Sequence, residues 1–126
     1  MNVLIIEPDG ILANTYQRAV VNAGENAYIA QNAQKAISMI DELKPSVIIL
    51  ELQLSGHSGI EFLHEFRSYE DWTNIKVIIH SSVPKTSLNL DARIWRQLGI
   101  YKYLYKATTS LDRLVDSVKS IHYENS

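Results

Sequence analysis

Four polar side chains of this sequence each lie at or just beyond the end of a short run of apolar residues. Glu7 follows Val-Leu-Ile-Ile, Glu51 follows Val-Ile-Ile-Leu, Ser81 comes soon after Val-Ile-Ile, and Lys106 follows a tyrosine-rich run. Apolar runs of this length are typical of buried parallel strands, and ligands bind where the carboxyl ends of such strands meet. The sequence therefore predicts one polar site that combines two carboxylates, a hydroxyl group and an ammonium group.

The charges of this site are expected to control one another. Lys106 favours the ionised form of Glu7 and Glu51, whereas the two carboxylates disfavour each other's charge. We therefore expect Lys106 to bridge the two acids. Because the chain contains no cysteine and its four histidines are not spaced as ligands, any metal ion would be held by oxygen.

Helical patterns alternate with the apolar runs, as expected for parallel βαβ units. The predicted strands are 3–6, 27–30, 47–50, 77–79 and 101–105, and the predicted helices are 11–23, 33–40, 60–66, 90–98 and 111–121. We expect 27–30 at a sheet edge and 47–50 at its centre. Thr109 and Asp112 suggest a capping box for the last helix, and the alternating Tyr101, Tyr103 and Tyr105 should share one face. The fold class predicted is doubly wound α/β, with five strands and five helices.

Length and composition limit the possible functions. With 126 residues, of which 46% are hydrophobic, the chain suits one domain over 1–126, without an effector domain. No apolar run is long enough to cross a membrane, so we expect a cytoplasmic protein. The net charge of −2 and the scattered lysines and arginines argue against direct nucleic-acid binding.

Taken in order, these motifs resemble the receiver domain of two-component response regulators over essentially the whole chain. Residues 3–9 are similar to the family's first strand and acidic pair, and residues 50–59 to its phosphoacceptor strand and loop. Lys106 stands at the family's lysine position, and Ser81 and Tyr103 at its hydroxyl and aromatic switch positions. The resemblance implies a flavodoxin-like fold with strand order 2-1-3-4-5 and a role in phosphorelay signalling rather than enzyme catalysis.

Two residues depart from the chemistry that the family implies, in which a magnesium-bound aspartate accepts a phosphoryl group from a histidine kinase. Glu51 replaces that aspartate and moves the carboxylate outward by one methylene, although phosphoryl transfer tolerates little misplacement. Pro8 replaces a magnesium ligand, which leaves Glu7, Glu51 and the Gln53 carbonyl as oxygen donors. We therefore expect no required cofactor. Asp9 either completes the acidic pocket with Glu7 or, as we favour, caps the following helix.

Three functions follow from this sequence. The first is an atypical receiver that signals to a protein partner through helix four, strand five and helix five without conventional phosphorylation. Its partner is a histidine kinase, an effector or a second copy, and Glu51 is either a permanent stand-in for phosphoaspartate or an inert ion pair with Lys106. The second is a phosphorylatable response regulator. The third is a flavodoxin-like enzyme or nucleotide binder. The sequence argues against it, because the first βα loop has no glycine-rich segment that could bind a phosphate group.

Overall fold

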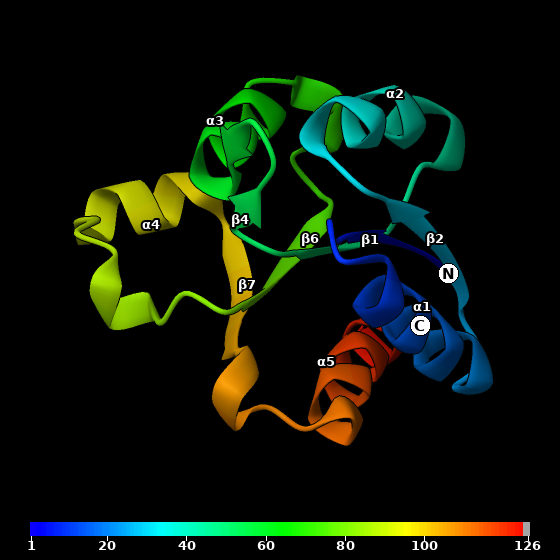
Figure 1. Ribbon diagram of the computed structural model, residues 1–126. Helices are drawn as coiled ribbons and strands as arrows, with labels where there is room; N and C mark the ends of the chain where they lie inside the picture. The colour runs from blue at the N-terminus through cyan, green and yellow to red at the C-terminus, as the bar shows by residue number, and fades with distance from the viewer. Residues whose placement is uncertain (125–126) are drawn as a thin grey trace.

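A computed structural model describes residues 1–124, and in it a five-stranded parallel sheet lies between two layers of helices (Figure 1). The strands are β1 (Asn2–Ile6), β2 (Asn26–Ala30), β3 (Val47–Leu50), β6 (Lys76–Ser81) and β7 (Ile100–Tyr105), and their order is β2-β1-β3-β6-β7. A small hairpin, β4 (Gln53–Leu54) and β5 (His57–Ser58), lies outside this sheet. The predicted order 2-1-3-4-5 is therefore confirmed, with residues 47–50 at the centre.

Five α-helices connect and cover the strands. They are α1 (Gly10–Asn22), α2 (Ala33–Leu43), α3 (Gly59–Arg67), α4 (Ala92–Leu98) and α5 (Leu111–Glu124), with 3-10 turns η1 (Glu70–Trp72), η2 (Lys85–Ser87) and η3 (Lys106–Thr108). Helices α1 and α5 cover one face of the sheet and α2 and α3 the other, with α4 beside β7 (Figure 1). Within residues 1–124 no helix is both long and apolar enough to span a bilayer.

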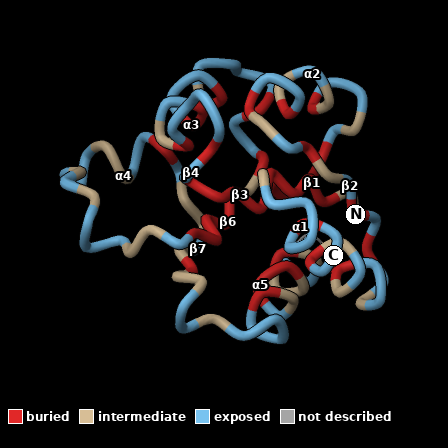
Figure 2. Tube along the Cα trace, viewed as in Figure 1, coloured by how far each residue is buried: buried red, intermediate tan, exposed pale blue. Residues whose placement is uncertain are grey.

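The central strands are buried on both faces, which explains their continuous apolar sequence. Leu4 and Ile48 point into the core under α2 and α3, whereas Ile5 and Ile49 point into the core under α1 and α5. The buried positions accordingly follow the strands through the middle of the molecule (Figure 2). This double core holds the strand ends, and the polar residues that follow them, in fixed relative positions.

Two local predictions were wrong. The cap of α5 is Ser110, whose hydroxyl oxygen accepts the backbone N–H of Arg113 at 3.1 Å, while Thr109 donates its hydroxyl to the Tyr105 carbonyl. Helix α4 begins only at Ala92, because the Asp91 carboxylate accepts the Ile94 N–H and so caps the helix there. In both places two polar residues close together in sequence could cap the helix: Thr109 or Ser110 before α5, and Asn89 or Asp91 before α4.

The three tyrosines of β7 do not share one face as predicted. Val77 of β6 pairs with Ile100 but Ile78 pairs with Lys102, so β7 contains one extra residue, Tyr101. Because of this β-bulge, the side chains before it point to the opposite side of the sheet from the one that simple alternation predicts. Tyr101 therefore packs on the α5 side, whereas Tyr103 packs on the α4 side.

Candidate functional site

Glu7, Glu51, Ser81 and Lys106 meet at the carboxyl edge of the sheet. Lys106 Nζ lies 2.5 Å from Glu7 Oε1 and 2.8 Å from Glu51 Oε1, and it bridges the two acids as expected. Glu7 and Glu51 are each only 4% exposed, and Ser81 is fully buried. The four side chains thus form one largely buried polar cluster.

Strand register positions this cluster. Ile6 of β1 pairs with Leu50 of β3, so Glu7 and Glu51 leave neighbouring strands at the same level. The backbone extends this alignment by one residue, because the Glu51 N–H donates to the Ile6 carbonyl at 3.0 Å. Lys106 follows directly after β7, which is separated from β3 by β6 in the sheet.

A close packing contact fixes the loop that follows Glu51. The Gly59 N–H donates to the Leu52 carbonyl at 2.7 Å. A Cβ atom at Gly59 would lie 2.6 Å from the Leu52 Cα, closer than real Cβ contacts allow. Glycine at this position therefore lets the start of α3 press against the loop that carries Glu51 and Gln53.

Both oxygens of the Glu51 carboxylate accept hydrogen bonds. Oε2 accepts the hydroxyl of Ser81 and the backbone N–H of Gln53, the latter at 3.2 Å. Oε1 accepts Lys106, and also the backbone N–H and hydroxyl of Ser82 at 3.1 and 3.2 Å. Burial alone would raise the pKa of Glu51, but the bonds from Lys106 and Ser81 and from the two amides lower it to about 2. Glu51 is thus a fixed, ionised carboxylate.

Lys106 has the matching environment. Burial disfavours its charge, but its hydrogen bonds to Glu51 and Glu7 outweigh burial and raise its pKa above the ordinary value. Its Nζ also lies 6.0 Å from the centre of the Tyr16 ring, within reach of a cation–π contact. One cation faces two carboxylates, so the cluster retains negative charge.

Hydrogen bonds lead from Glu51 toward the α4 side of the molecule. The Ser81 hydroxyl donates to Glu51 and accepts the Val83 N–H at 3.0 Å, and the Tyr103 hydroxyl donates to the Val83 carbonyl at 2.6 Å. Burial, and next the charge of Glu51, raise the pKa of Tyr103 to about 12. The Tyr103 ring packs edge-on against the Trp95 ring, with the two ring centroids 6.0 Å apart. The serine and tyrosine singled out in the sequence are therefore joined through one backbone residue.

Asp9 lies at the start of α1, where its Oδ1 accepts the N–H groups of Ile11 and Leu12 at 3.0 and 3.1 Å. The favoured role, helix capping, is what the structure shows, so Asp9 does not join Glu7 in contacting Lys106. The single proton of the Ser82 hydroxyl is shared between two acceptors, because its oxygen lies 3.2 Å from Glu51 Oε1 and 2.8 Å from the Gln53 side-chain oxygen. In the described part of the chain no group of three or more His, Asp or Glu side chains is arranged to hold a metal ion.

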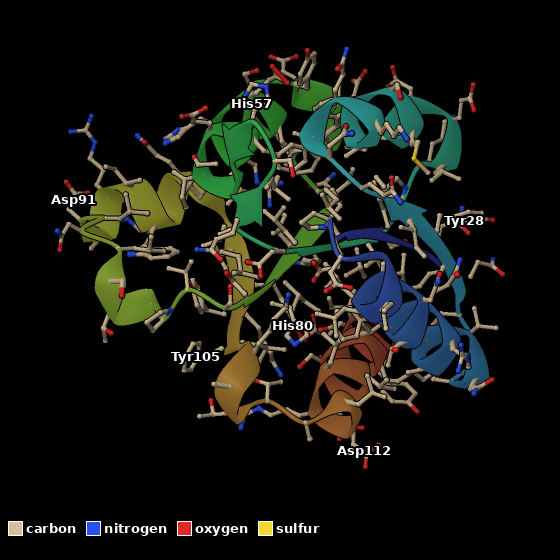
Figure 3. All side chains as sticks on the ribbon, viewed as in Figure 1. Tyr28, His57, His80, Asp91, Tyr105 and Asp112 are labelled. Carbon is tan, nitrogen blue, oxygen red and sulfur yellow. The ribbon has the colours of Figure 1, made fainter. Side chains whose placement is uncertain are left out.

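His80, Tyr16 and Ser82 also surround the site, although the sequence patterns did not predict a role for them there. His80 (Figure 3) is 5% exposed, and its Nδ1 has no hydrogen-bond partner among residues 1–124. Its ring packs edge-on against that of Tyr16, with the ring centroids 4.8 Å apart. Burial, and next the positive charge of Lys106, lower its pKa to about 4. For His80 the sequence signal is a histidine directly after the apolar run Val77 to Ile79. Ser82 had none, because its contact with Glu51 depends on the turn after β6.

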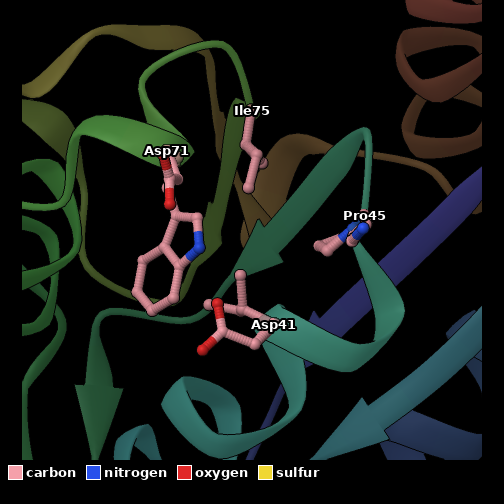
Figure 4. A pocket seen from close by; sticks show the side chains of 7 residues that line it. Asp41, Pro45, Asp71 and Ile75 are labelled. Carbon is pink, nitrogen blue, oxygen red and sulfur yellow. The ribbon is translucent and has the colours of Figure 1, made fainter.

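A separate pocket of about 390 Å³ lies at the opposite edge of the sheet, where β3 and β6 begin (Figure 4). It is lined by Asp41, Pro45, Asp71 and Ile75, among others. Its two acidic side chains come from α2 and η1 and have no connection with Glu51. This pocket is therefore not part of the polar cluster.

Comparison with known proteins gives the same result from sequence and from structure. The family model described as the response regulator receiver domain matches residues 3–119. The KDP operon transcriptional regulatory protein KdpE of Escherichia coli is 31% identical over 81 residues, which are 64% of this chain and 35% of that protein. The polar-differentiation response regulator DivK of Brucella anthropi is 24% identical over 119 residues, 94% of each chain. The chain thus spans about a third of KdpE but nearly all of DivK.

Solved structures share the fold over almost the whole chain. The receiver domain of the Francisella response regulator 1452 has a TM-score of 0.84 at 22% identity, covering 99% of this chain and 98% of that one. The signal receiver domain of a DNA-binding response regulator from Colwellia psychrerythraea has a TM-score of 0.82 at 25% identity, covering 98% of each. The resemblance drawn from the sequence motifs is therefore confirmed.

Proposed function

The chain belongs to the response regulator receiver domain family, and we propose that it is an atypical receiver, a protein-binding switch that works without conventional aspartate phosphorylation. In this proposal the fixed carboxylate of Glu51 takes the place of a phosphorylated aspartate. The neighbouring residues then hold the domain in one signalling state. Its signal reaches a protein partner, a kinase or an effector, through α4, β7 and α5.

The carrying observation is the hydrogen bonding of Glu51. Lys106 and Ser81, which contact the phosphoryl group in the family, here donate to the two oxygens of the Glu51 side chain. The two backbone N–H groups of Gln53 and Ser82 complete the arrangement. Such a donor set suits a fixed anion, because the hydrogen bonds are charge-assisted and the surroundings are largely dry. A carboxylate already held this way has little freedom to attack a phosphoryl donor in line.

The bonded path from Ser81 to Tyr103 supports signalling rather than an inert ion pair. Ser81 contacts Glu51 and Val83 at the same time, and Val83 in turn accepts the Tyr103 hydroxyl. Loss of the Glu51 contact would free Ser81 and so affect the turn that Tyr103 holds. The charge of Glu51 is thereby coupled to the position of an aromatic side chain on the α4 side.

Magnesium, the ion that the family uses, does not fit the donors found here. Lys106 Nζ lies within 3 Å of one oxygen on each of Glu7 and Glu51, so an ammonium group stands between the two carboxylates. Asp9 is engaged at the N-terminus of α1, and Pro8 offers no side-chain oxygen. Magnesium requires near-octahedral oxygen coordination, which these side chains do not supply without rearrangement. We therefore propose that the domain needs no metal ion.

The proposal is tested by incubating the protein with acetyl phosphate and magnesium and measuring its intact mass. We expect no stoichiometric phosphate adduct. A second arm replaces Glu51 by aspartate together with Pro8→Asp, which restores the family's residues and should allow an adduct to form. An adduct on the unmodified protein that disappears in Glu51→Gln would show instead that this is a phosphorylatable regulator.

A further inference from the structure

The charges of this chain are unevenly divided. Residues 72–111 contain six lysines and arginines but only one acidic residue, Asp91, whereas the whole chain has 12 basic and 14 acidic residues. The remainder therefore carries thirteen acidic and six basic side chains. Although the lysines and arginines are scattered along the chain as a whole, the region of α4 and β7 is basic in a protein of net charge −2.

Four of these cations line two neighbouring hollows around β7 and α4. One hollow, of about 170 Å³, is lined by Lys85, Trp95, Ile100, Tyr101, Lys102 and Tyr103. The other, of about 370 Å³, includes Lys76, Arg96 and the half-buried Arg67 in its lining. In the described part of the chain, no acidic side chain lines either hollow. We name Lys76, Lys85, Arg96 and Lys102 the basic strip.

The cations of the basic strip are available to a partner. In residues 1–124 none of the four forms an ion pair. Instead Lys85 Nζ lies 5.1 Å from the Trp95 ring centre, and Lys76 and Lys102 lie 5.8 and 5.9 Å from that of Tyr101. Asp91 is engaged in capping α4 and lies at its outer end (Figure 3). Glu124 accepts the Tyr101 hydroxyl on the α5 side.

From this arrangement we infer that the basic strip binds an acidic segment of a partner protein, with carboxylates on the four cations and one apolar side chain in the hollow beside Trp95. The inference rests on the proposed function, in which the domain acts by binding a protein. Charge complementarity identifies the partner's chemistry, because a strip of unpaired cations repels basic surfaces. The adjoining Trp95 and Tyr103 supply the apolar contact that gives an interface its affinity.

Two other occupants fit the strip less well. Single-stranded nucleic acid stacks its bases on open aromatic faces, but lysines already lie over the rings of Trp95 and Tyr101. A symmetric dimer through this surface would place cations against cations, because such an interface uses the same patch on both subunits. A contact between the basic strip and an acidic surface of another copy would be head-to-tail and would propagate into open chains.

The test titrates the isotope-labelled protein with an acidic peptide and follows its backbone amides by NMR. The peptide has about ten glutamate and aspartate residues around one leucine, which span roughly 35 Å when the chain is extended. Lys85→Glu and Lys102→Glu are compared with Lys35→Glu, which reverses an exposed cation on α2. The same titration with oligothymidylate tests binding of single-stranded nucleic acid. Sedimentation of the protein alone tests binding of a second copy of the chain.

We expect shifts centred on residues 76, 85, 96 and 102. We also expect binding to weaken about tenfold or more in each strip variant and to stay unchanged in Lys35→Glu. If a strip variant fails to fold, the positions of the shifted amides in the unmodified protein still show whether the peptide binds at the basic strip. Shifts elsewhere, no shifts, an equal loss in Lys35→Glu, tighter binding of oligothymidylate, or self-association abolished by Lys85→Glu would each overturn the inference. None of these outcomes bears on phosphorylation, which the mass measurement reports separately.

Discussion

Lys106 Nζ lies 2.8 Å from Oε1 of Glu51, and the two side chains are only 16% and 4% exposed. A pair so little exposed to water differs from a surface ion pair, because removal of either partner leaves a buried charge without compensation.

Replacement of Lys106 by methionine should destabilise the protein by about 3 kcal/mol, because Glu7 and Glu51 would remain buried without their cation. Urea denaturation measures the change in the free energy of unfolding. The double variant with Glu51→Gln should recover part of the loss, since one of the two carboxylates is then neutral. A loss in Lys106→Met no greater than in Lys35→Met, on the exposed face of α2, would contradict the expectation.

Replacement of Ser81 by alanine should cost about 1–3 kcal/mol, because its hydroxyl both donates to Glu51 and accepts the Val83 N–H. It should also change the fluorescence of Trp95, whose ring contacts Tyr103. The spectra are recorded in a Trp72→Phe background, which leaves Trp95 as the reporter. Ser82→Ala, at an exposed position, serves as the control and should have the smaller effect on both measurements. Unchanged fluorescence in a folded Ser81→Ala variant would argue that the two positions are not coupled.

His80 should make stability depend on pH. Its pKa is lowered from 6.5 to about 4 in the folded protein, so the neutral form is favoured by folding. Its contribution is therefore present above pH of about 6.5 and is lost as the pH falls toward 4, by about 3 kcal/mol in all. His80→Leu should lack this dependence. The difference between the two proteins' free energies of unfolding across that range isolates the histidine from the acidic residues, and a constant difference would refute the idea.

Gly59→Ala should destabilise the protein by about 2 kcal/mol or more, because the new methyl group would lie 2.6 Å from the Leu52 backbone. Gly10→Ala is a matched control: nothing lies within 4 Å of a Cβ there, and alanine is the better residue in the α1 helix. Thermal unfolding of both variants checks the prediction. Similar melting temperatures would mean that the loop after Glu51 yields easily.

The strand order and the central cluster could be predicted because they follow from regular patterns. Val47 to Leu50 is apolar at every position, and so had to be a strand covered on both faces. Once the strands were parallel, their ends had to lie together, which brought Glu7, Glu51 and Lys106 to one edge. These inferences require only periodicity and the direction of the chain.

The parts that could not be predicted depend on single residues that break such patterns. The alternation of the tyrosines in β7 would have placed them on one face, but the bulge at Tyr101 turns this side chain to the other side of the sheet. Ser110 and Thr109 have the same capping group, and only the backbone decides between them. The contact of Ser82 with Glu51 arises from the turn after β6, which has no sequence period.

The concentration of positive charge in residues 72–111 also leads us to expect an electric dipole, with its positive end over α4 and β7. A dipole of this kind acts at a distance, before any side chains touch. It turns the approaching domain so that this end meets an oppositely charged surface first, which raises the association rate at low ionic strength. The uneven distribution of charge would therefore govern how quickly the domain finds its partner as well as where it binds.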